Sequence, residues 1–361
     1  MIKYSIDGPT IHIETDAIKA DIRTEGYTSG VAAGSFLDKK TGARDVGFGL
    51  SIVDFLLEPA DASKPIEPGQ YEYGDKFAAY HGDIPKRYVE GPQICTQAKK
   101  LAFEVLQGNG FLAVRQWFTW HQGYAPYRGG SRWEQTLVFT ENDRFFFSSD
   151  RVTTVNECRS LFFRVDMPGH IKHKEGDSFE HIYLSYGKHG EQTLPSTEFQ
   201  MDFSPDTQNL YQRGNQPLPE RFIRAYQVKL SAEEKGVGSL LPGRPEGCFA
   251  QKTPVPFFVV DGQPGPWLAG MTLEPRDTYE AWCHQRGYVC LIQELGGWPT
   301  KPGDTLGAAY VVGWFDNISA THAAYDRYRG WSGIELKGDP TRPSAFVGVK
   351  QKELTPVKQR T

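Results

Sequence analysis

The sequence predicts an all-β protein in which large antiparallel sheets pack as a sandwich, with one short helix near the C-terminal end. Aromatic residues make up 13% of the 361 residues, and the chain contains 38 Gly and 24 Pro. Aromatic residues favour strands, whereas frequent Gly and Pro favour many turns over long helices. Short segments alternate apolar and polar residues, and turn residues separate nearly all of them, as in antiparallel sandwiches.

The strand pattern begins near the N-terminus. Apolar and polar residues alternate over Thr10–Thr15 and again over Ile18–Ile22, followed by a turn at Asp38–Gly42. This period of two is typical of half-buried strands. Further strands are expected at Phe111–Trp120, Trp133–Phe139, Arg144–Val155, Ser160–Val165, His181–Ser185, Arg221–Leu230, Pro256–Val260, Trp267–Leu273, Tyr288–Glu294 and Ala308–Phe315.

One segment, Ile318–Arg329, has the pattern of a helix. Its larger side chains recur every three or four residues, and Gly330 would end it. The residues available to cap its first turn are Asp316, Asn317 and Ser319.

The chain shows no internal repeat and no clear linker between domains. We therefore expect one sandwich domain over residues 1–331 and a C-terminal extension over residues 332–361. The Pro-rich stretch Glu58–Glu72 and the polar stretch Glu191–Glu220 are expected to be long loops over one face of a sheet.

The charge and the distribution of apolar residues indicate which partners and which cell compartment to expect. The net charge of −4 gives no basic field for nucleic acid, despite a locally basic tail at Lys350–Arg360. No segment has the roughly 18 apolar residues of a membrane helix. The first residues lack the apolar core of a signal peptide. We expect a soluble protein, cytoplasmic as given, or periplasmic or secreted if a leader was removed, with no nucleic-acid or membrane partner.

Five widely spaced cysteines without a Cys-x-x-Cys pair predict reduced, mostly buried thiols. A disulfide between Cys283 and Cys290, which flank a turn at Arg286–Gly287, is the alternative for that pair.

The most informative stretch is Tyr279–Phe315, which is expected to form two buried strands with a Gly/Pro-rich connection. Glu294 stands where the first strand is expected to end, and Trp298 follows it. A carboxylate beside an indole suits a saccharide, because a sugar presents hydroxyls to bind and a C–H face to stack. The alternative is a solvated strand-end carboxylate.

The segments Ile11–Lys19 and Ser35–Gly42, together with the late strand ending in Glu294 and the run Lys301-Pro-Gly-Asp, resemble galactose-mutarotase-like domains. These are large antiparallel β-supersandwiches found in aldose epimerases, glycoside hydrolases and polysaccharide lyases. The resemblance implies a carbohydrate-active enzyme, in which a late glutamate comparable to Glu294 acts as the base in the epimerases.

One departure from this family concerns the acid histidine. Epimerases carry it in an Asn-His-Ser/Thr-Tyr-Phe-like motif that this chain lacks, and the nearest analogue is Asp166–His173. A general acid or base role for His170 or His173 is one reading of that segment. A divalent metal held by His-x-x-His and the acids that follow is the other. We expect no cofactor and keep a divalent metal as the alternative.

A second group lies in the segment Tyr80–Tyr88. It contains Tyr80 and His81 as acid/base candidates and Lys86 and Arg87 as cations. A lyase that cleaves beside a uronic acid needs a cation for the carboxylate, a base for the C5 proton and an acid for the leaving oxygen. A solvated charged loop is the alternative.

The third group is aromatic and follows Trp117. Trp120, Tyr124, Tyr127 and Trp133 are candidate stacking platforms for a sugar, with His121 and Glu134 as polar partners. Burial of these rings for packing is the alternative.

The last group surrounds Glu294. Arg286 and Trp298 are candidates for substrate binding, and Glu280 and His284 would share a face if residues 277–285 formed a short helix. Nearby aromatic rings would desolvate Glu294 and raise its pKa.

Three functions remain open. Proton transfer at a sugar ring by a lyase, with β-elimination next to a uronic acid, is slightly favoured because Tyr, His, Arg and Lys cluster. An aldose 1-epimerase and a non-catalytic glycan-binding sandwich are the alternatives. The expected partner is a saccharide, and an anionic one under the lyase hypothesis.

Overall fold

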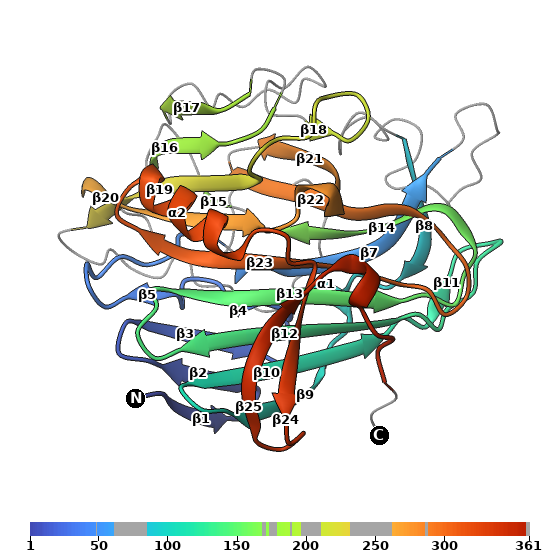
Figure 1. The fold of residues 1–361 in the computed structure, drawn as a ribbon, viewed down its shortest axis with the longest axis horizontal. Coiled ribbons are helices and arrows are strands. Elements are labelled where there is room, and N and C mark those ends of the chain that lie inside the picture. Colours follow the sequence, from blue (N-terminus) through green and yellow to red (C-terminus); the bar gives the residue numbers. More distant parts are fainter. Residues whose placement is uncertain are drawn as a thin grey trace.

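The protein is an all-β sandwich, as the sequence predicts. The computed structural model describes residues 1–47, 49–60, 85–167, 171–172, 179–187, 190–195, 211–231, 262–285 and 288–358. Two large antiparallel sheets dominate these residues, and their strands run across the molecule in Figure 1.

The larger sheet has nine strands within the described residues. In spatial order these are β17 (Gln192–Pro195), β16 (Phe179–Leu184), β19 (Ile223–Ser231), β20 (Gly262–Thr272), β23 (Thr305–Phe315), β13 (Phe145–Thr153), β12 (Arg132–Thr140), β10 (Phe111–Thr119) and β9 (Ala102–Gln107).

The second large sheet has eight strands within the same residues. Its order is β11 (Gln122–Gly123), β8 (Lys86–Gly91), β7 (Ile52–Pro59), β14 (Cys158–Asp166), β22 (Tyr288–Thr300), β21 (Thr278–Gln285) and β18 (Tyr211–Gln212), and β15 (Ile171–Lys172) also pairs with β22.

Smaller elements cover the sandwich. The N-terminal sheet contains β1 (Lys3–Asp7), β2 (Thr10–Glu14), β3 (Ile18–Arg23) and β5 (Leu37–Asp38), and β4 (Val31–Ala32) pairs with β6 (Gly49–Leu50). Within the described residues, the helices are α1 (Ile94–Gln97), α2 (Ile318–Tyr328), and the 3₁₀ turns Pro275–Asp277 and Gln351–Glu353. The hairpin of β24 (Gly333–Gly338) and β25 (Pro343–Val349) crosses the nine-stranded sheet steeply in Figure 1.

The core forms because the strands alternate inward and outward residues. On β14, Phe163 and Val165 enter the main core, whereas the charged Arg164 stands between them. On β22, Leu291, Gln293 and Leu295 share the inward face, and both leucines belong to the main core. This alternation confirms that both segments are strands with one face toward the opposite sheet.

A buried arginine joins the two sheets inside the core. Arg224 of β19 is fully buried, and its Nη1 donates to Gln293 Oε1 of β22 at 2.9 Å. Its Nε donates to the Met167 carbonyl, just beyond β14, at 2.8 Å. Thr272 of β20 donates to the same Gln293 oxygen at 2.6 Å. Because buried polar groups are costly without partners, these bonds fix how the two sheets face each other.

The helix prediction is confirmed. α2 begins after Asn317, whose side chain accepts from the Ala320 amide, and Asn317 is therefore the cap among the three candidates. The proposed short helix at residues 277–285 is wrong, because Thr278–Gln285 is strand β21 and pairs along its length with β22. The strand expected at Pro256–Val260 lies outside the described residues.

The expected strand end at Glu294 is also wrong. β22 continues to Thr300, so Glu294 lies within the strand. Gly296 and Gly297 have φ values of 107° and 70°, and the pairing with β14 shifts register beside them. Glycine inside a strand pattern therefore marks a bulge here and not a turn.

We predict that Gly296→Ala destabilises the protein more than a positive φ alone explains. A Cβ at Gly296 would lie 2.7 Å from the Leu161 carbonyl oxygen, a backbone atom that cannot move aside cheaply. The free energy of unfolding, measured by urea denaturation, should fall by about 2–4 kcal/mol.

Gly303→Ala is the matched control. Gly303 has a φ of 93°, but no atom would lie within 4 Å of a Cβ added there. It should cost only about 1 kcal/mol, the strain of the backbone conformation. Equal losses in the two variants would contradict the close approach at the bulge.

Candidate functional site

The candidate site lies on the outer face of the eight-stranded sheet, the face turned away from the nine-stranded sheet. Since Phe163 and Val165 point into the core, Arg164 points outward from β14. By the same alternation Glu294 points outward from β22, next to the inward Gln293 and Leu295.

Four charged side chains meet on this outer face, and we name Lys86, Arg164, Glu280 and Glu294 the four-charge cluster. Arg164 Nη2 lies 2.8 Å from Glu294 Oε1, and Lys86 Nζ lies 2.7 Å from Glu280 Oε2. Lys86 Nζ is also 3.6 Å from Glu294 Oε2, so it lies between the two carboxylates. Arg164 is 3% exposed and the other three side chains are 0% exposed.

Strand register explains why these charges gather. Glu294 stands directly opposite Arg164 on one neighbouring strand and opposite Glu280 on the other. Two carboxylates directly opposite each other repel, so the arrangement requires cations between them.

Lys86 shows that the sheet is curved. It belongs to β8, and three strands separate β8 from β21 in the sheet order. In a flat sheet, four spacings of about 4.8 Å would hold the two strands roughly 19 Å apart, too far for a direct lysine–glutamate contact. The 2.7 Å contact therefore requires that the outer face is concave.

An indole lines the same cluster. The Lys86 ammonium lies 4.8 Å and the Arg164 guanidinium 5.2 Å from the ring centre of Trp282 on β21. Trp282 packs with Cys290 and Ile292 of β22 in a small apolar group on this face. The two cations thus have a desolvated, π-rich surrounding as well as carboxylate partners.

The electrostatic consequence falls on Glu294. Burial raises its pKa from the usual 4.5 to about 8, and the nearby Lys86 and Arg164 only partly offset this rise, while Glu280 adds to it. The raised pKa that the sequence predicts is therefore confirmed. A carboxyl group that keeps its proton near neutral pH can act as a general acid.

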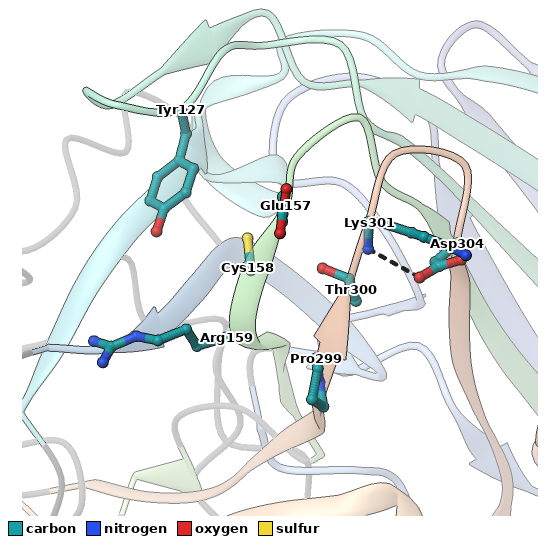
Figure 2. Close-up of a pocket in the computed structure, with 8 residues that line it drawn as sticks. All are labelled: Tyr127, Glu157, Cys158, Arg159, Pro299, Thr300, Lys301 and Asp304. Carbon is teal, nitrogen blue, oxygen red and sulfur yellow. Dashed lines mark hydrogen bonds between the residues drawn. The ribbon is translucent and has the colours of Figure 1, made fainter.

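A cleft of about 690 Å³ opens at one end of the strands that carry Arg164 and Glu294. Figure 2 shows Cys158 and Arg159 at the start of β14 facing Pro299 and Thr300 at the end of β22, with Tyr127 opposite them. The Lys301 amide donates to Asp304 at 2.9 Å and shapes the turn that closes this end.

Tyr127 joins this cleft to strand β8. Its hydroxyl donates to Glu58, and the Arg87 guanidinium lies 4.8 Å from its ring centre. Arg87 Nε is also 3.4 Å from Glu58 Oε1. Arg87 is therefore held beside the cleft and not in the four-charge cluster.

Tyr124 takes a position suited to an aromatic wall. Its ring stacks on the ring of Tyr88, with ring centres 4.9 Å apart. The ring centres of Tyr88 and Phe55 are 5.0 Å apart. Tyr88 is two residues from Lys86 on β8, so both share a face of the sheet.

The expectation that Trp120 and Trp133 are stacking platforms is wrong. Both are 0% exposed in the main core, and the Trp133 indole donates to Asp150 at 2.8 Å. Trp133 lies on the core face of β12, and Trp120, one residue beyond the end of β10, continues the alternation of that strand into the core. His121 is exposed and packs against Phe118 with ring centres 6.0 Å apart.

Trp298 lies on β22 beyond the glycine bulge. It is partly buried against the main core, and the Arg213 guanidinium lies 3.7 Å from its ring centre. One face of this indole is thus occupied by a cation within the protein.

Several candidates cannot be placed. Tyr80, His81, His170, His173 and Arg286 all lie outside the described residues. Within the residues that are described, no group of three or more His, Cys, Asp or Glu side chains is arranged to hold a metal ion. Cys95, Cys158 and Cys290 are buried free thiols. In the register between β21 and β22, Cys290 stands opposite His284, whereas Cys283 stands opposite Leu291.

Sequence reasoning missed Arg164 and Trp282 and gave Lys86 and Glu280 only minor roles. The available signal was the charged residue in Leu161-Phe-Phe-Arg-Val-Asp, because a charge inside an apolar strand needs a partner.

Among the described residues, no helix combines the length and apolar character needed to cross a membrane.

We predict that Glu294 makes the stability of the protein depend on pH. Between about pH 4.5 and pH 8 the unfolded chain loses this proton while the folded protein keeps it, so the free energy of unfolding falls as pH rises. Gln at this position cannot titrate. The stability of Glu294→Gln relative to the wild type should therefore rise across this window, by on the order of 2–4 kcal/mol.

Urea denaturation of both proteins at several pH values checks this. Burial also raises the pKa of Asp45 and Asp150 to about 7, and their titration cancels because both proteins contain them. A stability difference that stays constant with pH would contradict a raised pKa at Glu294.

Comparisons with known proteins give fold likenesses only. No family model and no curated protein matches the chain. Matching solved structures include a galactose 1-epimerase from Lactobacillus acidophilus (TM-score 0.44, 9% identity, covering 88% of this chain and 98% of that one). A TPR-domain containing protein from Parabacteroides distasonis also matches, with a TM-score of 0.38 and 10% identity, covering 85% of this chain and 47% of that one. A 4-alpha-glucanotransferase from Thermococcus litoralis matches with a TM-score of 0.36 and 9% identity, covering 87% of this chain and 39% of that one.

This chain spans about half the length of the Parabacteroides protein. Two of these three structures are named as a galactose 1-epimerase and a 4-alpha-glucanotransferase. Each TM-score is below 0.5, so the functional proposal rests on the chain's own residues.

Proposed function

We propose that the protein is a carbohydrate-active enzyme that transfers a proton at a sugar ring, with Glu294 as the proton-transfer residue. The observation that carries this proposal is the burial of Glu294 between Arg164 and Lys86, at 2.8 and 3.6 Å, on the concave outer face. Its raised pKa lets the carboxyl group donate a proton near neutral pH.

A purely structural role explains the cluster less well. Burying four charged groups costs more free energy than well-packed apolar residues would, so such clusters contribute little net stability. Strongly perturbed carboxyl groups next to specific counter-charges are instead typical of functional sites.

The charges in the cluster favour an anionic saccharide. When Glu294 is protonated, Lys86 and Arg164 remain as two cations next to its carboxyl group. A uronate carboxylate is the part of a saccharide that would accept charge-assisted hydrogen bonds from such cations.

These features support β-elimination next to a uronic acid. A base removes the C5 proton, the electron pair forms the C4–C5 double bond, and the C4–O bond breaks as the leaving oxygen takes a proton from Glu294. Lys86 and Arg164 stabilise the charge that develops on the carboxylate. The base is the role for which the sequence offers Tyr80, His81, His170 and His173.

The test is a screen of acidic polysaccharides, including pectic, algal and arabinogalactan substrates. Elimination produces an unsaturated uronate, which is detected by its ultraviolet absorbance. We predict that the wild type forms this product from at least one substrate and that Glu294→Gln lowers kcat about 100-fold or more, with KM little changed.

Asp38→Asn is the matched control. Asp38 is another fully buried carboxylate, paired with Arg144 at 2.6 Å, but it belongs to the N-terminal sheet. This variant should lose stability and keep its kcat. If Glu294→Gln retains full activity while folded, Glu294 is not the proton-transfer residue. A change of optical rotation of aldoses without cleavage would replace elimination by epimerisation.

A further inference from the structure

The N-terminal sheet ends in an exposed edge strand. Within the described residues this sheet has the order β1-β2-β3-β5, so β1 (Lys3–Asp7) pairs with β2 on one side and forms the edge on the other. All five of its residues are exposed, and Figure 1 shows the strand at the lower margin of the molecule. An edge strand presents a row of N–H and C=O groups with which a further strand can pair.

One face of this edge strand is apolar. Tyr4 stands opposite Ile13 of β2. Ile6 stands opposite Ile11, and residues directly opposite each other share a face of the sheet. Both isoleucines of β2 are buried in the main core, whereas Tyr4 and Ile6 are 44% and 51% exposed. The apolar face of the sheet therefore extends one strand beyond the part that the core covers.

The other face of β1 carries a cation at one end and an anion at the other. Lys3, Ser5 and Asp7 alternate with the two apolar residues and so lie on this face. The residue opposite Asp7 on β2 is the uncharged Thr10. Glu14, opposite Lys3, is already paired with two other lysines, at 3.3 and 2.9 Å. Because Lys3 and Asp7 are exposed, both charges can reach a strand that approaches this edge.

The sequence of β1 matches itself in the antiparallel direction. When a second copy of the strand lies alongside with Ser5 opposite Ser5, Lys3 stands opposite the second copy's Asp7, and Asp7 stands opposite its Lys3. The same register sets Tyr4 opposite the second copy's Ile6. Opposite charges and pairs of an aromatic with a β-branched residue are favourable cross-strand neighbours. The strand therefore complements a second copy of itself in both charge and shape.

Other arrangements of two copies fit this edge less well. In a parallel pair with the same residues aligned, Lys3 would face Lys3 and Asp7 would face Asp7, and like charges opposite each other repel. An antiparallel pair shifted by two residues would separate Lys3 from Asp7 and shorten the paired segment. A lysine on an edge strand ordinarily hinders pairing with another chain. Asp7 offsets that effect when the second copy runs antiparallel.

We propose that the β1 edge binds a second copy of this chain, with the two strands antiparallel about Ser5, so that the two N-terminal sheets form one continuous sheet. The contact is two-fold symmetric, as in most protein dimers. Five paired residues bury less than the roughly 800 Å² per partner of a standard interface, so the dimer is weak and forms at high protein concentration. The four-charge cluster lies on another sheet and takes no part in the contact.

The test is sedimentation velocity of the full chain, with any purification tag at its C-terminal end, over an about hundredfold range of concentration up to about 500 µM. The wild type should pass from monomer to dimer as the concentration rises. Lys3→Glu sets acidic residues opposite each other across the contact, and Asp7→Lys sets lysines opposite each other. Each variant should raise the Kd of the dimer about tenfold or more.

A mixture of the two variants tests the register itself. When one copy carries Lys3→Glu and the other carries Asp7→Lys, each introduced charge faces an opposite charge in the antiparallel register about Ser5. The equimolar mixture should therefore dimerise like the wild type, although each variant alone is weakened.

Lys352→Glu is the matched control. Lys352 is exposed on the 3₁₀ turn Gln351–Glu353, and this substitution changes the net charge by the same amount as Lys3→Glu. It should leave the dimer unchanged. A wild type that stays monomeric at every concentration, or a dimer that Lys3→Glu weakens no more than Lys352→Glu does, would overturn the proposal. So would a mixture of Lys3→Glu and Asp7→Lys that stays monomeric.

Discussion

The structure depends most on the alternation of residues along β22, combined with its register between β14 and β21. Gln293 points inward to Arg224 and Thr272 and so connects the two sheets. Glu294, the next residue, must then point outward, where register places it opposite both Arg164 and Glu280. A shift by one residue would put a carboxylate into the core and remove the link between the sheets.

Burial gives the inner and outer groups different chemistry. Inside the sandwich Gln293 is neutral, and its side-chain oxygen accepts hydrogen bonds from Arg224 and Thr272. On the outer face the same loss of water acts on ionisable groups and shifts the pKa of Glu294 upward. The concave sheet brings Lys86 from a distant strand into that environment, so curvature as well as sequence determines which charges meet.

Much of the strand pattern could be predicted from the sequence because alternation and turn residues are local signals. Glu294 could be singled out as a candidate from its neighbours in the sequence of β22 and β21. Its partners were harder to find, because Arg164 is 130 residues and Lys86 is 208 residues away along the chain (294 − 86). Trp120 and Trp133 were misplaced since composition gives the presence of an aromatic ring, but only the sheet pairing gives the side to which it points.

The candidate site follows from a general property of a sandwich. Each large sheet has one face in the shared core and one outer face. The core face holds apolar side chains and hydrogen-bonded groups such as Gln293 and Arg224, whereas the outer face can gather ionisable groups. On the eight-stranded sheet, cations and carboxylates gather under full burial, which changes the proton affinity of Glu294.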